Sequence, residues 1–185
     1  MARFRSMLAA ACLAVGTVFV TACSTLPNEV NRNKIDTDSR EALATLYAQN
    51  DAAKAIGSKA RAVLIFPSMV KAGLGIGGAY GEGEMRHGNA VSGYYSSFTG
   101  SWGLQAGAQS YGYAVFLMND DAVKYVEESE GWEIGVGPTV VLVNAGVAQN
   151  LSTTSLQDDA YAFIFDQKGL MAGISIEGTK INKLD

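Results

Sequence analysis

Histidine and cysteine are almost absent from this chain, and their scarcity excludes several kinds of chemistry. The only histidine is His87, and the two cysteines, Cys12 and Cys23, lie within the first 23 of 185 residues. A zinc site needs several His or Cys ligands, and a catalytic triad would have to use His87, which lies in a predicted turn. The chain beyond Cys23 can form no disulfide. We therefore expect no enzymatic activity, no metal and no cofactor.

Charged residues are also few, and acidic residues outnumber basic ones. They make up 17% of the chain, which has a formal net charge of −4. Without residues 1–22, which contain two arginines and no acids, 12 basic and 18 acidic residues remain, a net charge of −6. Nucleic acids are bound through basic surfaces, so this balance argues against them as partners. Residues 23–71 have seven basic and five acidic residues, whereas the rest of the chain has five and thirteen.

Two glycine-containing motifs are similar to nucleotide-binding sequences but lack the required context. Residues 73–78 satisfy G-x-G-x-x-G. That fingerprint must open a helix, because the pyrophosphate lies at the helix N-terminus, whereas this sequence continues with the alternation of a strand. Residues 173–180 are similar to a P-loop motif, but their lysine and threonine are in the wrong order. We therefore expect no nucleotide ligand.

The first 23 residues have the features of a bacterial lipoprotein signal. Two arginines precede an apolar stretch, residues 7–20, that is short for a transmembrane helix, and residues 20–23 resemble a lipobox. This resemblance implies cleavage before Cys23 and acylation of its sulfur and amino group, and two or more acyl chains hold a protein firmly in a bilayer. Ser24 favours the periplasmic leaflet of the outer membrane. The alternative is an ordinary secretory signal that is cleaved elsewhere.

Alternating glycines make residues 71–85 the most distinctive stretch of the chain. One face carries Gly73, Gly75, Gly77, Ala79, Gly81 and Gly83, and the other carries Leu74, Ile76, Gly78, Tyr80, Glu82 and Glu84. This period of two indicates a strand with one face almost free of side chains. Glycine weakens a strand unless a bend or a close backbone approach requires it. We expect a strongly bent sheet in which another layer packs closely on the glycines, with Glu82 and Glu84 facing solvent.

An amphipathic helix is predicted near the start of the folded domain. We expect a signal peptide over residues 1–22, a polar tether over 23–37 and the domain over 38–185. Asp38, with Glu41 three residues later, is typical of a helix N-terminus, and apolar residues recur at helical spacing until Gly57. Basic residues lie on or just beyond its outer face: Arg40, Lys54, Lys59 and Arg61. Such a helix usually packs on its own core, and the alternative is that it also faces a membrane.

Short segments separated by turn signals follow this helix. They include residues 62–66 before Pro67, 91–98, 102–118 with a bend at Gly112, and an apolar hairpin of 161–165 and 170–176. A short helix capped by Asn119 interrupts them, and residues 145–159 are interpreted as a loop or weak edge. No strand is regularly followed by a long helix, which disfavours a parallel sheet. We expect an α+β fold with a strongly bent, mostly antiparallel, partly barrel-like sheet of about nine short strands and two or three covering helices.

Several long motifs occur in order along the chain: residues 63–73, the glycine run through Gly83, and residues 102–109, 131–136 and 168–181. Together they resemble the SYLF domain family, a lipid- and actin-binding module of eukaryotes with many bacterial members. The resemblance implies phospholipid binding through a basic, amphipathic N-terminal region, and no catalysis. This chain departs from that pattern because its predicted helix is only mildly basic. The motifs are mostly glycine and apolar residues, so no binding residue is carried over.

Two functions are compatible with these observations. The first is a lipid-anchored protein of the outer membrane that binds anionic phospholipids, with Cys23 as the anchor and these basic residues at the headgroups: Arg40, Lys54, Lys59 and Arg61. The second is a tethered interaction module for an envelope or host protein, acting through a group of tyrosines: Tyr94, Tyr95, Tyr111 and Tyr113.

Overall fold

The computed structural model describes residues 32–143 and 156–184. Asn31–Asp185 form one compact unit, and the other unit, Met1–Val30, lies outside the described residues together with the predicted signal peptide and Cys23. The helices are α1 (Arg32–Gln49), α2 (Asp51–Gly57) and α3 (Asp120–Glu128). The strands are β1 (Ala62–His87), β2 (Ala90–Leu117), β3 (Trp132–Glu133), β4 (Val140–Leu142) and β5 (Ala160–Leu184). None of the described helices is both long and apolar enough to cross a bilayer.

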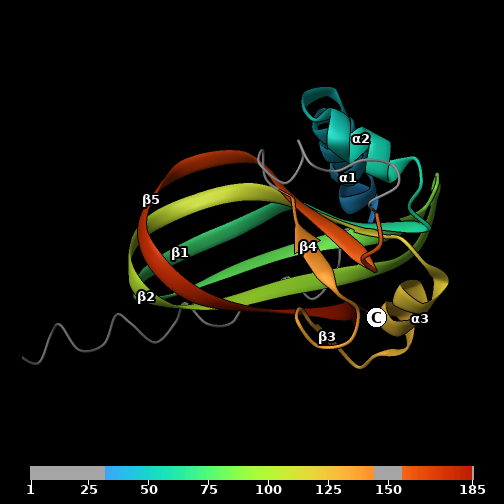
Figure 1. Cartoon of the computed structure of the whole chain (residues 1–185). Coiled ribbons are helices and arrows are strands. Elements are labelled where there is room, and N and C mark those ends of the chain that lie inside the picture. The colour runs from blue at the N-terminus through green and yellow to red at the C-terminus, as the bar shows by residue number, and fades with distance from the viewer. Residues whose placement is uncertain (1–31, 144–155, 185) are drawn as a thin grey trace, which may run out of the picture. The chain divides into compact units, whose positions relative to one another are not determined.

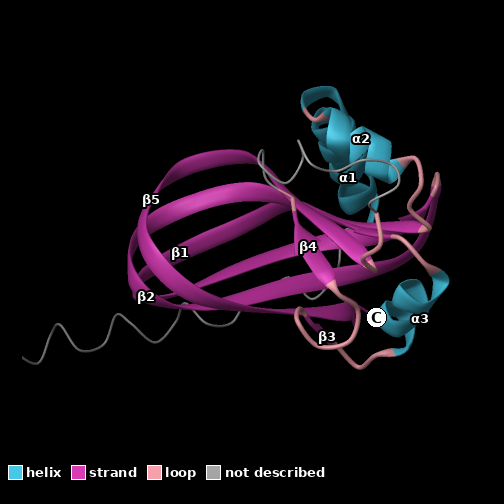
Figure 2. Ribbon diagram, viewed as in Figure 1, coloured by secondary structure: helices cyan, strands magenta, loops and turns pink. Residues whose placement is uncertain are grey.

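One sheet contains all five described strands, in the order β1-β2-β5-β3, with β4 also paired to β5 (Figure 2). The β4–β5 pairing is parallel and the other three are antiparallel. The α+β class, the three helices and the bent, mostly antiparallel sheet are therefore confirmed. The prediction of about nine short strands is wrong, because β1, β2 and β5 have 26, 28 and 25 residues.

The expected strand breaks are irregularities inside continuous strands. Register shifts follow Phe66 in β1, next to Pro67, which was interpreted as a strand end, and Ser110 in β2, near Gly112, which was interpreted as a bend. The predicted hairpin turn at residues 166–169 does not form, because Asp166 and Gln167 stand together opposite Tyr111. An extra residue of this kind is a β-bulge, which bends a strand and increases its twist without ending it.

The three long strands run away from the helices, curve together and return (Figure 1). We call the curved middle part, around residues 72–78, 100–108 and 169–176, the bend. Gly75 lies in it with a φ of 74°, a conformation that L side chains rarely adopt. The β1–β2 register slips at this glycine, because Leu74 pairs with Ala106 whereas Ile76 pairs with Trp102. The glycine run is thus the place where the sheet turns back.

The returning half of β1 packs closely on its outgoing half, as the glycine face predicts. A Cβ atom at Gly83 would collide with the carbonyl oxygen of Ile65, and one at Gly81 would lie 2.7 Å from the carbonyl oxygen of Ser68. Only glycine leaves room for this backbone approach.

Two hydrophobic clusters lie on opposite faces of the sheet at its helical end. One lies within the curl and includes Leu64, Phe66, Met85, Tyr95 and Trp132. The other lies between the sheet and α1 and α2 and includes Leu46, Ile56, Ile65, Phe116 and Phe163. The sheet is therefore buried on both faces at the helical end.

The helices begin and end partly where the sequence indicates. Asn119 caps α3 as expected, its side chain accepting a hydrogen bond from the Ala122 N–H at 2.8 Å. Asp38 does not cap a helix, because α1 is already helical at Arg32, and residues 32–37 of the expected tether belong to it. The long predicted helix is also divided, since Asn50 caps α2.

We predict that Gly83→Ala lowers the free energy of unfolding by about 1–3 kcal/mol, the usual cost of overpacking a closely packed site. Urea unfolding followed by circular dichroism measures this. The matched control is Gly178→Ala in β5, where an added Cβ would meet nothing within 4 Å. Equal effects of the two substitutions would contradict the close packing of β1 on itself.

Candidate functional site

Large apolar side chains project into solvent from the bend. Five of them have exposed fractions between 74% and 89%, and we call them the apolar bend surface: Leu74, Ile76, Trp102, Leu104 and Leu170. Soluble proteins seldom expose a continuous apolar patch, and such patches usually mark contacts with a membrane or another protein.

The strand register places these side chains next to one another. On β2, Trp102, Leu104, Ala106 and Ala108 alternate with inward residues and are all exposed. Ile76 pairs with Trp102 on one side, and Leu74 pairs with Ala106. Leu170 pairs with Ala108 on the other side. Neighbours across strands on one face lie about 4.5–5.5 Å apart at Cβ, so the surface is continuous over all three strands.

The inner face of the bend is polar, the reverse of an ordinary soluble sheet. The buried polar side chains there are Lys71, Thr99, Ser101 and Gln105, each no more than 6% exposed. They are hydrogen-bonded in pairs: Lys71 with Glu177, Ser101 with Gln105 at 2.8 Å, and Thr99 with Thr179 at 2.8 Å. These bonds compensate the cost of removing polar groups from water.

The bend thus has polar groups inside and apolar groups outside. Charge is also missing from the surface, because residues 90–118, which contain all of β2, include no Lys, Arg, Asp or Glu. Exposing apolar side chains in this way is unfavourable in water, whereas it is favourable where the outer side meets a nonpolar environment. The bend is therefore the candidate site for contact with a nonpolar partner.

The four basic residues predicted to contact headgroups lie at the helical end, away from the bend (Figure 1). All four are exposed. The Arg40 Nε donates to the Asp36 carbonyl oxygen at 3.1 Å, and Arg61 forms an ion pair with Asp120 at 3.6 Å. Lys54 lies on α2 and Lys59 just beyond it. The structure does not bring these residues together with the apolar bend surface.

The tyrosines proposed as an interaction surface are mostly not at the surface. Tyr95 and Tyr111 are buried, at 1% and 8% exposure, which excludes them from a protein contact. Tyr94 donates a hydrogen bond to the Asp36 carboxylate at 2.8 Å and so connects α1 to β2. Tyr113 is half-buried. The prediction failed because the alternation in β2 does not show which of its faces is inside.

Glu84 is also inside, although the sequence suggested a solvent-facing pair with Glu82. Its side chain is fully buried and forms an ion pair with Arg86, which also donates to the Asn89 carbonyl oxygen at 2.7 Å. Burial raises the pKa of Glu84 from 4.5 to about 7, with Arg86 opposing the rise and the Asp36 carboxylate adding to it. A buried carboxyl group favours its neutral form because the charged form loses its hydration.

We predict that the protein loses stability as the pH rises from about 4.5 to 7. In this interval Glu84 keeps its proton in the folded protein but has released it in the unfolded chain. The contribution of Glu84 to stability is therefore complete below pH 4.5 and is lost as the pH rises to about 7. The slope should reach up to about 1.4 kcal/mol per pH unit. Urea unfolding over this range should show a flatter profile for Glu84→Gln than for Glu82→Gln. Identical profiles for the two variants would contradict the raised pKa.

Metal-binding side chains are not grouped in the part of the chain that the structure describes. Among those residues, no three His, Cys, Asp or Glu side chains are close enough together to hold an ion. His87 is exposed at the end of β1 and lies 3.6 Å from Glu127.

Two signals in the sequence could have identified the apolar bend surface. One is the pair Leu74 and Ile76 on the face opposite the glycines, and the other is the uncharged stretch of residues 90–118. Each is ambiguous alone, because apolar residues in a strand usually face the core. Their exposure follows from the bend, which leaves room inside only for glycine and hydrogen-bonded polar groups.

Fold and site together define an α+β domain with a curled, mixed sheet and an exposed apolar surface. Its C-terminal part matches the family model Ysc84, described as Las17-binding protein actin regulator, over residues 98–185. This match confirms the SYLF resemblance over residues 98–185. No curated protein matches the chain. The matched region includes Trp102, Leu104 and Leu170 of the bend but neither α1 nor α2.

Proposed function

We propose that this protein is a lipid-anchored, non-catalytic protein of the bacterial envelope that binds phospholipid membranes through its bend. The observation that carries the proposal is the apolar bend surface, five large uncharged side chains held in solvent above a polar inner face. The family description, a Las17-binding actin regulator, supports a binding role in general. The SYLF resemblance and this surface support lipid binding.

The energetics favour a shallow insertion. Complete transfer of one large apolar side chain from water contributes about 1.5–3 kcal/mol, so even partial burial of five gives measurable affinity. Deep insertion is disfavoured because β1 is the edge of the sheet at the bend, and its free backbone groups need water. The bend should therefore lie at the level of the headgroups, with only its side chains among the acyl chains.

The lipid anchor would keep this surface close to the bilayer. In this proposal Cys23 carries acyl chains in the periplasmic leaflet of the outer membrane, and attachment raises the effective concentration of the bend at that membrane. The helical end, which lies away from the bend, would offer a separate electrostatic contact through Arg40, Lys54, Lys59 and Arg61, each contributing on the order of 1 kcal/mol near an anionic surface.

We predict that Leu104→Asp combined with Leu170→Asp lowers vesicle binding of residues 31–185 at least tenfold, because two charges then face the acyl chains. Flotation with neutral and with anionic vesicles measures the bound fraction. The matched control is Val136→Asp, an exposed apolar residue outside the bend with 56% exposure.

The same assay separates the two contacts. Replacing the four basic residues with Gln should weaken binding to anionic vesicles only and reduce its dependence on salt. If the Gln variant binds like the parent, the headgroup role of these residues is abandoned. Equal binding by the bend variant, the Val136→Asp control and the parent would exclude the bend as the membrane contact.

We predict that Cys23→Ser abolishes incorporation of radioactive palmitate in bacterial cells and moves the protein from the membrane fraction to the soluble fraction. Acylation requires the cysteine sulfur, so serine at this position leaves no site for the first lipid. Labelled Cys23→Ser protein would exclude this anchor. Cys12→Ser is the control, because this residue lies within the predicted signal peptide and should have no effect.

A tethered protein-interaction module is the second candidate. The description of the family as a Las17-binding protein favours it, because an exposed apolar surface also suits a protein partner. Capture of one specific envelope or host protein that depends on Leu104, without vesicle binding by the same domain, would support this function instead.

A further inference from the structure

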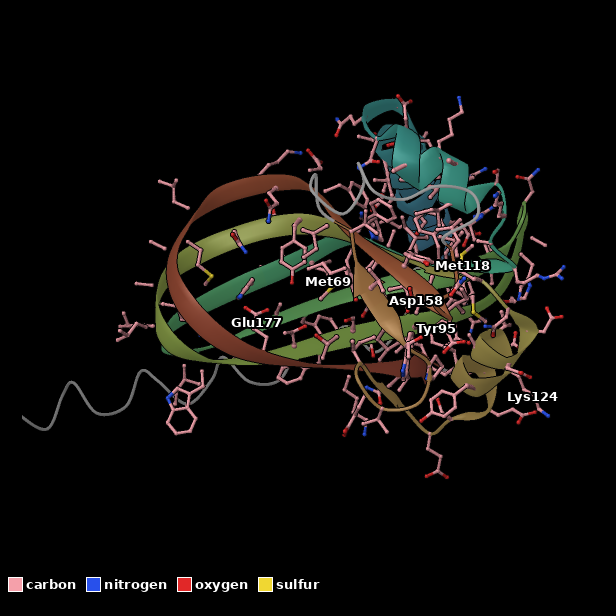
Figure 3. All side chains as sticks on the ribbon, in the orientation of Figure 1. Met69, Tyr95, Met118, Lys124, Asp158 and Glu177 are labelled. Atoms are coloured by element: carbon pink, nitrogen blue, oxygen red, sulfur yellow. The ribbon has the colours of Figure 1, made fainter. Side chains whose placement is uncertain are left out.

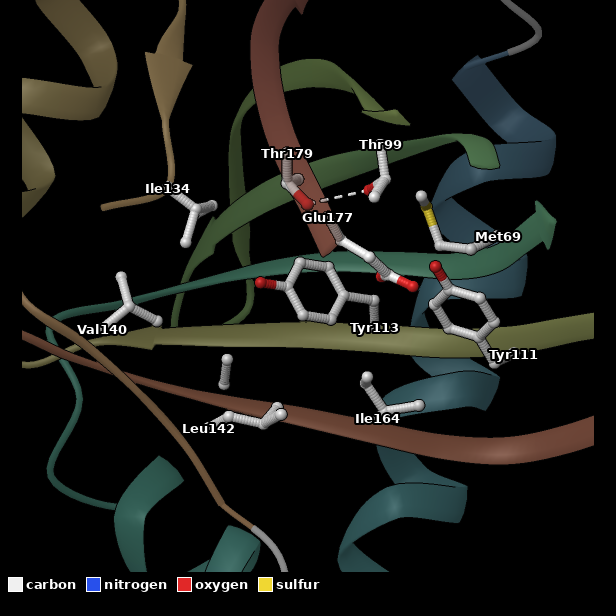
Figure 4. Close-up of a pocket in the computed structure, with 11 residues that line it drawn as sticks. Met69, Thr99, Tyr111, Tyr113, Ile134, Val140, Leu142, Ile164, Glu177 and Thr179 are labelled. Atoms are coloured by element: carbon white, nitrogen blue, oxygen red, sulfur yellow. Dashed lines mark hydrogen bonds between the residues drawn. The ribbon is translucent and has the colours of Figure 1, made fainter. Parts of the chain in front are cut away.

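A cavity of about 200 Å³ lies on the inner side of the sheet, separate from the apolar bend surface (Figure 4). Strands β1, β2 and β5 form its floor and walls, and the segment between Ile134 and Leu142 covers one side. Met69 and Glu177, which line it, project between the long strands (Figure 3). Neither the proposed anchor nor the membrane contact uses this space.

Two tyrosine hydroxyl groups face the cavity. Tyr111 is only 8% exposed, and neither its hydroxyl nor that of Tyr113 is hydrogen-bonded to another residue in the described part of the chain. Figure 4 shows both hydroxyl groups directed into the space between the lining side chains. Burial raises the pKa of Tyr111 to about 12, so its hydroxyl stays protonated and available as a donor. Both hydroxyl groups can therefore donate a hydrogen bond to an occupant of the cavity that has an acceptor oxygen.

The rest of the lining is mainly apolar and carries no net charge. Ile134, Val140, Leu142 and Ile164 form the apolar side. Leu142 and Ile164 are 52% and 42% exposed, so the cavity has an apolar entrance. The one carboxylate, Glu177, is paired with Lys71, which cancels its charge. A charged ligand would lose its hydration here without an unpaired counter-charge, whereas a neutral one would not.

We propose that this cavity binds an uncharged amphipathic molecule with a small apolar body and one hydroxyl or carbonyl oxygen, as represented by medium-chain alcohols. An engineered apolar cavity of about 150 Å³ holds benzene, so this slightly larger one accommodates a ring or a short chain. The oxygen accepts a hydrogen bond from Tyr111 or Tyr113, and the chain lies against the apolar side. The proposal is independent of membrane binding by the bend.

The test is an NMR titration of residues 31–185 with 1-butanol, 1-hexanol, 1-octanol and 1-decanol. Kd should fall about fourfold for each added methylene, as 0.8 kcal/mol per buried CH₂ implies, and then stop falling once the cavity is full. Hexanoate and hexylammonium should bind at least tenfold more weakly than hexanol. The proposal is overturned if affinity keeps rising through decanol, if the charged analogues bind as tightly as hexanol, or if no saturable binding is seen.

Variants locate the binding. Leu142→Trp fills the entrance and should remove hexanol binding, while Tyr111→Phe combined with Tyr113→Phe should weaken it about fivefold, the value of one hydrogen bond. The double Phe variant keeps both rings, so it tests the site even if the Trp variant does not fold. Tyr94→Phe, which changes a tyrosine outside the cavity, and Leu104→Asp on the bend should leave Kd unchanged. Loss of binding in the Leu104→Asp variant, or none in Leu142→Trp, would place the alcohol elsewhere.

Discussion

The close approach of the two halves of β1 is the constraint on which the rest of the structure depends. At Gly83 the returning backbone lies against Ile65, and no other residue type leaves room for it. This contact closes the curl, and the curl determines which face of every later strand is inside. The inner side of the bend holds glycines and hydrogen-bonded polar side chains, and the large apolar residues are left on the outer face. The exposed surface is therefore a consequence of the glycine run.

The sequence predicted the character of individual segments better than it predicted where the strands begin and end. The alternation in residues 71–85 indicated a strand with a bare face, and Asn119 indicated the start of α3, and both are confirmed. Pro67 and residues 166–169 were interpreted as ends of strands, because a turn and a bulge use the same residue types. Only the partner strand distinguishes them: Asp166 and Gln167 face Tyr111 within a ladder that continues on both sides.

The candidate site was less predictable than the fold. Arg40, Lys54, Lys59 and Arg61 were identified from charge, which a sequence shows directly, and they remain a prediction. The apolar bend surface depends on which face of β2 is outside, and alternation alone does not contain that information. The buried Glu84 was missed for the same reason. Inside and outside are properties of the whole sheet, which forms only when residues far apart in the chain are paired.

The pairing of β2 with β5 also has a consequence for how the chain folds. Tyr94 pairs with Leu184 and Leu117 with Ala160, so β2 gains its second neighbour only after some forty to ninety intervening residues have been made. Long-range pairing of this kind closes slowly. Until then an uncharged strand of 28 residues has an open edge, which is the state most prone to self-association.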